Sequence, residues 1–313
     1  MQTETRSLVE EIGQLKKKKN AVILAHYYTR PEVQDIADFT GDSLALSQQA
    51  AQTDASIILF AGVHFMAETA KILSPDKKVL LPDPEAACSL ADSCEAAAFE
   101  RFLKNYPDHL VVAYVNTSVG VKALTDVCCT SSNAVDIVRR IPRDRKIVFA
   151  PDRNLGNYIK SVTGRDDMVV WDGACHVHEE FSVEKILELK KSYPNAPVLA
   201  HPECKKTVLL TADVIGSTAA LLKHASTSSA DTFIVVTESG ILHQMQHENP
   251  NKRFIPAPPI DSTCGCNDCR YMKMVTLEKI HRALRDEQPE VVIEESLRRR
   301  AERSIRNMLE GTF

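Results

Sequence analysis

The apolar stretch Val22-Ile23-Leu24-Ala25-His26 recurs twice along the chain, as Val111-Val112-Ala113-Tyr114 and as Pro197-Val198-Leu199-Ala200-His201. The offset from His26 to Tyr114 is 88 residues, and the offset from Tyr114 to His201 is 87. Self-similarity at a nearly constant period indicates that one structural unit is repeated. The sequence therefore predicts three similar units.

Each copy continues with the same features in the same order. An aspartate follows thirteen residues after the last alanine of the stretch, and a hydroxyl residue comes soon after it. A second apolar run and a cysteine complete the copy. The aspartates are Asp38, Asp126 and Asp213, the hydroxyl residues are Ser43, Ser131 and Ser217-Thr218, the second apolar runs are residues 57–60, 147–149 and 233–236, and the cysteines are Cys88, Cys175 and the group Cys264, Cys266 and Cys269.

One cysteine from each unit suggests a site on a pseudo-threefold axis. Three thiolates are one fewer than the four that close a structural zinc site or an iron–sulfur cluster, so a metal centre held by them keeps an open coordination position. A substrate oxygen could bind there. The alternative is that the repeat reflects only a strand–helix rhythm and that the cysteines are small buried residues, the common role of a free cysteine.

Short β-branched runs alternate with longer helical patterns, which is typical of βαβ units around parallel sheets. The apolar runs suit sheets that are buried on both faces. Strands are predicted near residues 21–25, 56–60, 79–81, 110–115, 146–150, 168–171, 197–200, 232–236 and 253–255. Helices are predicted near residues 6–19, 43–52, 64–73, 94–105, 131–140, 153–163, 182–192, 217–225 and 239–247, and the charged sequence from about residue 276 onward is predicted to pack back as a helical appendage.

The composition is that of an ordinary globular protein, with 313 residues, 44% hydrophobic and 26% charged. The net charge of −4 offers no broad basic field for a nucleic-acid backbone, so we expect no nucleic-acid partner. The sequence has no apolar signal region and no stretch of 18 apolar residues, so we expect no membrane contact and a cytoplasmic location. Nine cysteines in a reducing compartment favour metal ligation or catalysis.

The residues that end the first strand of each copy are His26, Tyr114 and His201. Functional residues of a parallel sheet collect beyond the carboxyl ends of its strands. The serine-bearing turn that follows opens a helix, whose free N–H groups favour an anion. Three such turns would suit a small, multiply anionic substrate such as a dicarboxylate or a sugar phosphate. The alternative is that the repeat serines are only helix N-caps.

Proton chemistry could come from these histidine and tyrosine side chains and from Glu203, a potential base two residues after His201. A histidine at a strand end can instead be a hydrogen-bonding core residue, and Glu203 could be explained by a favourable interaction with a helix dipole. The tract of Cys, His, Val, His and Glu at residues 175–179 could bind a metal, but only if a turn brings its ligands together. The chain has no glycine-rich phosphate loop of the usual spacing, which disfavours a nicotinamide- or ATP-dependent reaction.

Short motifs span nearly the entire chain. They are AHYYTRPEVQDIAD at 25–38, GDSL at 41–44, CSLAD at 88–92, AYVNT at 113–117, CCTSSNA at 128–134, PDRNLG at 151–156, HPEC at 201–204 and GST at 216–218. Together and in this order they resemble the quinolinate synthase family. The resemblance implies an α/β fold of three pseudo-threefold-related, three-layer αβα domains with short parallel sheets around a central 4Fe-4S cluster. Divided at the cysteines, the expected domains are residues 1–88 with 270–313, residues 89–175 and residues 176–269.

The resemblance also implies a reaction and its residues. Iminoaspartate and dihydroxyacetone phosphate would condense to quinolinate with loss of phosphate and two waters, an early step of NAD biosynthesis, while the open iron of the cluster acts as a Lewis acid. The implied catalytic residues are Tyr28, Glu203 and Tyr114, of which Tyr28 and Glu203 move protons. The implied substrate-binding residues are His26, Ser43, Tyr114, Asn116, Ser131, His176, His201, Glu203, Ser217 and Thr218.

The implied cluster ligands are Cys88, Cys175 and Cys269. The family often has C-x-x-C-x-x-C at the last position, whereas this chain has C-x-C-x-x-C, so Cys266 stays open as the alternative to Cys269. The implied partners are the two small substrates and, transiently, an aspartate-oxidising enzyme that supplies iminoaspartate. Two other classes stay open: an iron–sulfur sensor or anion-binding protein without turnover, and a zinc hydrolase.

Overall fold

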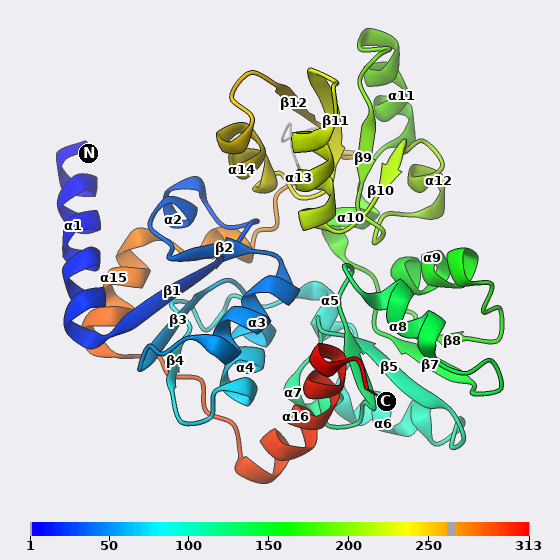
Figure 1. The fold of residues 1–313 in the computed structure, drawn as a ribbon, viewed down its shortest axis with the longest axis horizontal. Coiled ribbons are helices and arrows are strands. Elements are labelled where there is room, and N and C mark those ends of the chain that lie inside the picture. Colours follow the sequence, from blue (N-terminus) through cyan, green and yellow to red (C-terminus); the bar gives the residue numbers. More distant parts are fainter. Residues whose placement is uncertain (1, 262–266, 313) are drawn as a thin grey trace.

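The computed structural model describes residues 2–261 and 267–312, with side chains from residue 6 onward. Three four-stranded parallel sheets share one strand order, in which the second strand pairs with one edge of the first strand and the third strand with the other (Figure 1). The predicted α/β fold with three short parallel sheets is confirmed. The first sheet is β2 (Phe39–Gly41), β1 (Ala21–His26), β3 (Ile57–Ala61) and β4 (Lys78–Leu80), the second is β6 (Val127–Cys129), β5 (Leu110–Tyr114), β7 (Ile147–Ala150) and β8 (Val169–Val170), and the third is β10 (Val214–Ile215), β9 (Val198–Ala200), β11 (Thr232–Val236) and β12 (Arg253–Pro256).

The second strand of each sheet, two or three residues long, is absent from the prediction. The repeat aspartates hold these strands in place. One carboxylate oxygen of each accepts the backbone N–H of a residue in the first strand at 2.7 or 2.8 Å, and the aspartate N–H donates to the carbonyl of that residue. The pairs are Asp38 with Ile23, Asp126 with Val111, and Asp213 with Val198. The most regular feature of the repeat therefore has a structural role.

Helices cover both faces of the sheets (Figure 1). All the predicted helices are present, with additional one-turn helices between them. Around the first sheet lie α1 (Gln2–Lys19), α2 (Pro31–Asp35), α3 (Ser43–Gln52), α4 (His64–Leu73) and α15 (Leu277–Asp286). Around the second lie α5 (Ser89–Asp92), α6 (Ala96–Leu103), α7 (Val119–Lys122), α8 (Ala134–Arg140) and α9 (Arg153–Thr163), and around the third lie α10 (His176–Glu179), α11 (Val183–Ser192), α12 (Lys206–Leu209), α13 (Thr218–Thr227) and α14 (Ile241–Glu248).

The core of the first sheet illustrates how the apolar runs produce three layers. Successive side chains of a strand point to opposite faces of its sheet. Ile23 and Ala25 pack with residues of α1 and α15, whereas Val22 and Leu24 pack with residues of α3 and α4. A run without polar alternation therefore fits a strand that is buried on both sides.

The predicted appendage consists of α15 and α16 (Glu295–Glu310), and a short 3₁₀ turn, Met272–Met274, precedes it. α15 lies against α1, whereas α16 lies between the helices of the first two sheets (Figure 1). Arg298 on α16 donates to the carbonyl of Ile72 in α4 at 3.1 Å, and Asn307 donates to the carbonyl of Asp126 at 2.9 Å. The last helix therefore ties the first sheet to the second.

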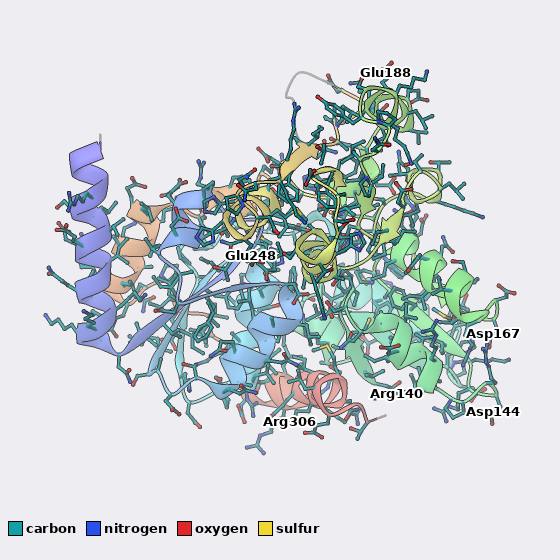
Figure 2. All side chains as sticks on the ribbon, turned by 45° about the horizontal axis from the view of Figure 1, so that its top comes forward. Arg140, Asp144, Asp167, Glu188, Glu248 and Arg306 are labelled. Atoms are coloured by element: carbon teal, nitrogen blue, oxygen red, sulfur yellow. The ribbon has the colours of Figure 1, made fainter. Side chains whose placement is uncertain are left out.

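The periphery carries charges of both signs. Figure 2 shows the labelled side chains of this kind, Arg140, Asp144, Asp167, Glu188, Glu248 and Arg306, and all six are exposed. In the parts of the chain that the structure describes, no helix has the length and apolar character required to cross a membrane.

Candidate active site

A cavity lies where the carboxyl ends of the strands in the three sheets converge. Its empty space is about 670 Å³, a volume that includes solvent at its open side. Each sheet contributes the residue at the end of its first strand and a hydroxyl residue from the turn after its second strand. The strand-end residues are His26, Tyr114 and His201, and the turn residues are Ser43, Ser131 and Thr218. Positions nearly 90 residues apart therefore meet because equivalent ends of repeated units face one another.

Every predicted site residue lines this cavity except Ser217. Ser217 is the N-cap of α13 and accepts the Ala220 N–H at 3.3 Å. Its hydroxyl also lies 2.8 Å from that of Ser132, which donates to Asp42 at 2.7 Å. This hydroxyl chain joins one turn from each of the three sheets. Ser217 thus has the alternative role of an N-cap and lies behind the cavity wall.

The other two repeat serines are not N-caps. Asp42 caps α3 by accepting the Ala45 N–H, so Ser43 is the first residue of that helix. Ser131 lies before α8, and its hydroxyl is 3.2 Å from Nε2 of His201. Both serines are free to face a ligand in the cavity.

Glu203 is buried at the centre of the site, with 3% of its surface exposed. The Tyr114 hydroxyl donates to its Oε1 at 2.6 Å, and Nδ1 of His178 lies 3.1 Å from its Oε2. Burial alone raises the pKa of this carboxyl, but the facing His178 and the Tyr114 hydrogen bond outweigh that effect and lower the pKa below its ordinary value. Glu203 is therefore an ionised carboxylate. It is not in the first turn of α12, so a helix dipole does not explain it.

Tyr28 lies across the cavity in a chain of hydrogen bonds. Its hydroxyl is 2.8 Å from the hydroxyls of both Thr218 and Thr237, and Thr237 in turn lies 3.0 Å from Nε2 of His178. Burial raises the pKa of Tyr28 well above its ordinary value, so the phenol keeps its proton. Through Thr237 and His178, the two predicted proton-transfer groups, Tyr28 and Glu203, belong to one continuous polar chain.

The two strand-end histidines are neutral. Burial lowers the pKa of His26 and of His201 to about 3. Nδ1 of His26 accepts the Tyr28 N–H at 3.2 Å, and Nδ1 of His201 accepts the Glu203 N–H at 3.3 Å. In each case the ring is held by the residue two positions later. The tautomer that leaves Nδ1 as acceptor presents an Nε2 proton, so both rings can donate a hydrogen bond.

The three predicted thiols, Cys88, Cys175 and Cys269, line the same cavity. Cys88 and Cys175 precede the first residues of α5 and α10, and Cys269 precedes the 3₁₀ turn. Burial raises the pKa of all three thiols. Cys269 raises the pKa of Cys88 further, and both of these thiols raise the pKa of Cys175. A cationic centre between them would remove this penalty. The alternative ligand Cys266 lies outside the described residues, as does Cys264.

In residues 2–261 and 267–312, a compact group of potential metal ligands consists of Cys175, His178 and Glu203, whose ligand atoms all lie within 4.8 Å of one another. Cys88 and Cys269 line the same cavity but do not belong to that group.

His176 lines the cavity, and its Nδ1 lies 2.7 Å from the hydroxyl of Ser89, the residue after Cys88. His178, three residues after Cys175, also lines the cavity, and its Nδ1 lies 3.1 Å from Glu203. The tract at residues 175–179 contained the signal for His178, but the sequence alone did not show that both histidines reach the site.

Glu238 is a buried site residue that the sequence did not indicate. Its Oε1 accepts the Cys269 N–H at 2.9 Å and pairs with Nζ of Lys273 at 2.8 Å, while its Oε2 accepts the Gly240 N–H at 2.7 Å. Burial raises its pKa to about 7, against the opposing effect of Lys273. A side chain at Gly240 would meet Tyr28 Cα at 2.7 Å. Glu238 therefore anchors the Cys269 segment where the first and third sheets meet, and its place just after β11 was the available signal.

Comparisons with known proteins agree with this arrangement. The family described as "Quinolinate synthetase A protein" matches residues 10–310. The quinolinate synthase of Thermosynechococcus vestitus is 60% identical over 303 residues, which cover 97% of this chain and 95% of that protein. Those of Microcystis aeruginosa and Synechocystis are 58% and 56% identical, over 97% and 98% of this chain and 94% and 96% of their own length. The chain therefore belongs to the quinolinate synthetase A family of enzymes.

Proposed function

We propose that this enzyme condenses iminoaspartate with dihydroxyacetone phosphate to form quinolinate, with release of phosphate and two waters, in the de novo synthesis of NAD. The observation that carries the proposal is the convergence of three thiols, the Glu203–Tyr114 pair and Tyr28 on one cavity. The names of its relatives support the same product.

Cys88, Cys175 and Cys269 would hold a 4Fe-4S cluster in this proposal. Their shared cavity and the raised pKa of each thiol, a penalty that a cationic centre would remove, support that choice. A cluster with one iron free of protein ligands supplies a Lewis acid for an oxygen or nitrogen atom of the substrate.

The surrounding residues would bind the anionic ends of the substrates. Ser43 and Thr218 are the first residues of α3 and α13, where backbone N–H groups favour phosphate or carboxylate. His26 and His201 are neutral donors, which suits recognition of oxygen atoms. Oδ1 of Asn116 is buried and lacks a hydrogen-bond partner within the described residues, so an amino or hydroxyl group of a ligand would satisfy it.

Glu203 and Tyr28 would move protons. The ionised Glu203 carboxylate can take a proton from carbon or nitrogen, and the Tyr114 hydroxyl holds that carboxylate in place at 2.6 Å. The protonated Tyr28 phenol can give a proton to a leaving hydroxyl. Thr237 lies between the two groups, within hydrogen-bond distance of the Tyr28 hydroxyl and of Nε2 of His178, whose other ring nitrogen faces Glu203.

The test combines anaerobically reconstituted protein with iminoaspartate and dihydroxyacetone phosphate and measures quinolinate. The enzyme is expected to form quinolinate, and Glu203→Gln with matched iron content is expected to be slower by about 10²- to 10⁴-fold. A spectral response to the ligands without any product would favour the sensor instead. Iron and sulfide contents of Cys88→Ala, Cys175→Ala and Cys269→Ala, compared with a Cys94→Ala control, test the cluster ligands separately.

A further inference from the structure

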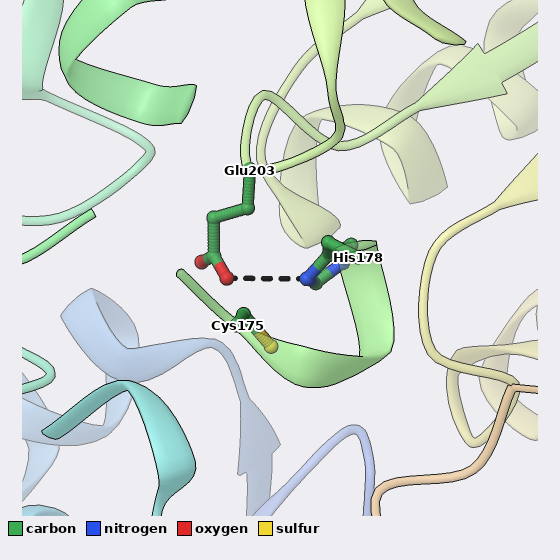
Figure 3. A group of neighbouring side chains, drawn as sticks. All are labelled: Cys175, His178 and Glu203. Atoms are coloured by element: carbon green, nitrogen blue, oxygen red, sulfur yellow. Dashed lines mark ion pairs between the residues drawn. The ribbon is translucent and has the colours of Figure 1, made fainter. Parts of the chain in front are cut away.

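The one-turn helix α10 brings two metal-binding side chains to one side of the cavity. Cys175 is its N-cap and His178 its third residue, and residues three apart on a helix share a face. Glu203 approaches from the third sheet, with its Oε2 at 3.1 Å from Nδ1 of His178 (Figure 3). The ligand atoms of these three residues all lie within 4.8 Å of one another.

Nδ1 of His178 is the atom that points to a ligand. His178 is 98% buried, and its Nδ1 has no aligned hydrogen bond within residues 2–261 and 267–312 although Glu203 lies at ion-pair distance. A buried nitrogen without a hydrogen-bond partner is costly. A metal cation between this nitrogen and the Glu203 oxygen would be coordinated by both atoms.

The atoms that a metal would leave free already have partners. Nε2 of His178 lies 3.0 Å from the Thr237 hydroxyl, and Oε1 of Glu203 accepts the Tyr114 hydroxyl at 2.6 Å. In protein metal sites, outer hydrogen bonds of this kind fix the histidine tautomer and orient the ligands. The outer contacts of a metal site are therefore present before any metal binds.

Charge and distance suit a single divalent cation. A Cys175 thiolate and the Glu203 carboxylate together balance a 2+ charge, and the thiol proton would leave to solvent on binding. A tetrahedral zinc places its nitrogen and oxygen ligands about 3.3 Å apart and its sulfur ligand about 3.6 Å from either. His178 and Glu203 are already at that spacing, and the Cys175 sulfur lies within 4.8 Å of both ligand atoms. The adjoining cavity leaves room for a water as fourth ligand.

We propose that, when the cluster is absent, Cys175, His178 and Glu203 bind one thiophilic divalent cation such as Zn²⁺, at a site that overlaps the active site. Because this site uses one of the three thiols that would hold the cluster, cation binding and cluster assembly exclude each other. The bound cation also engages the carboxylate that catalysis requires. Zinc is therefore an inhibitor of cluster assembly, and its site is distinct from a site formed by the three cysteines.

The test measures cation binding to the full-length protein after anaerobic removal of the cluster. Equilibrium dialysis should give one tightly bound Zn²⁺ per chain, and Co²⁺ should show the sulfur-to-cobalt charge-transfer band of a tetrahedral thiolate site. Loss of a hydrogen-bond partner of a metal ligand weakens metal binding by roughly 10- to 100-fold. Cys175→Ser and His178→Gln change a ligand itself, so they should weaken binding by more than that. Cys88→Ala and Cys269→Ala are the matched controls and should bind as tightly as the unmodified chain.

Three results would overturn the proposal. They are the absence of stoichiometric binding, equal binding by the cluster-loaded protein, and a loss of binding in Cys88→Ala as large as in Cys175→Ser. The last result would place the cation among the three thiols. Thermal unfolding of each variant shows whether it is folded, and Thr237→Val, which keeps all three ligands, gives a second measurement with an expected loss of about 10- to 100-fold. Quinolinate formation is not measured, so this test can fail while the proposed reaction stands.

Discussion

Thr237 is the residue through which Tyr28 and His178 are connected, and its replacement by valine removes only that connection. The threonine hydroxyl lies 2.8 Å from the Tyr28 hydroxyl and 3.0 Å from Nε2 of His178, and the side chain is 2% exposed. Valine has nearly the same shape but no hydroxyl. In Thr237→Val, Tyr28 keeps only its contact with Thr218, and Nε2 of His178 loses its partner.

The size of the effect follows from these two hydrogen bonds. Each neutral hydrogen bond contributes about 0.5–1.5 kcal/mol, so the variant should lose about 1–3 kcal/mol of the free energy of unfolding. If the same interactions hold Tyr28 and His178 in place during the reaction, a loss of that size corresponds to a turnover about 5- to 150-fold slower. Thr237→Ser keeps the hydroxyl and loses one methyl group, so it should stay within about 1 kcal/mol and within a few-fold of the unmodified enzyme.

The assay measures quinolinate formation by the three proteins under anaerobic conditions at matched iron and sulfide content. Unfolding by urea gives the stability of each in parallel. Turnover should fall in Thr237→Val and recover in Thr237→Ser. Equal turnover in all three proteins would refute the connection, and equal loss in both variants would show that packing at this position matters and the hydroxyl does not.

Three further predictions concern the scaffold and the buried charges. Asp126→Ala removes the carboxylate that holds a short strand and should lower the free energy of unfolding by about 1–2 kcal/mol. Asp136 is an exposed helix residue, so Asp136→Ala should change the free energy of unfolding little. Similar values for the two variants would contradict the structural role of the repeat aspartates. Burial lowers the pKa of His26 and His201 to about 3, so near pH 6 and below the unfolded chain binds more protons than the folded protein. The free energy of unfolding should therefore fall by roughly 1.5 kcal/mol per histidine between pH 6.5 and 5. A free energy of unfolding by denaturant that does not change across this range would contradict this prediction. Lys273→Met leaves the buried glutamate near Cys269 without its cation and should cost about 3 kcal/mol, with a lower iron content after reconstitution, and an unchanged unfolding midpoint would show that the pair is dispensable.

Local sequence determined the units of this fold. Apolar runs such as residues 22–25 must be buried on both faces, and their recurrence predicted three parallel sheets because equal patterns fold into equal structures. The predicted site residues lie together in the structure for a related reason. His26, Tyr114 and His201 all stand at strand ends, and the carboxyl ends of parallel strands share one edge.

Tertiary structure alone decided how these units use their polar residues. The second strand of each sheet is held by a side chain such as that of Asp38, whose backbone partner lies fifteen residues away, and local periodicity does not reveal such contacts. Thr237 and Glu238 carry no motif and become part of the site only because the end of β11 faces the segments of Tyr28 and Cys269. His176 and His178 both line the cavity but have different partners, Ser89 from the region of the second sheet and Glu203 from that of the third. Burial and long-range contact set these roles, and both arise only when the three sheets are packed together.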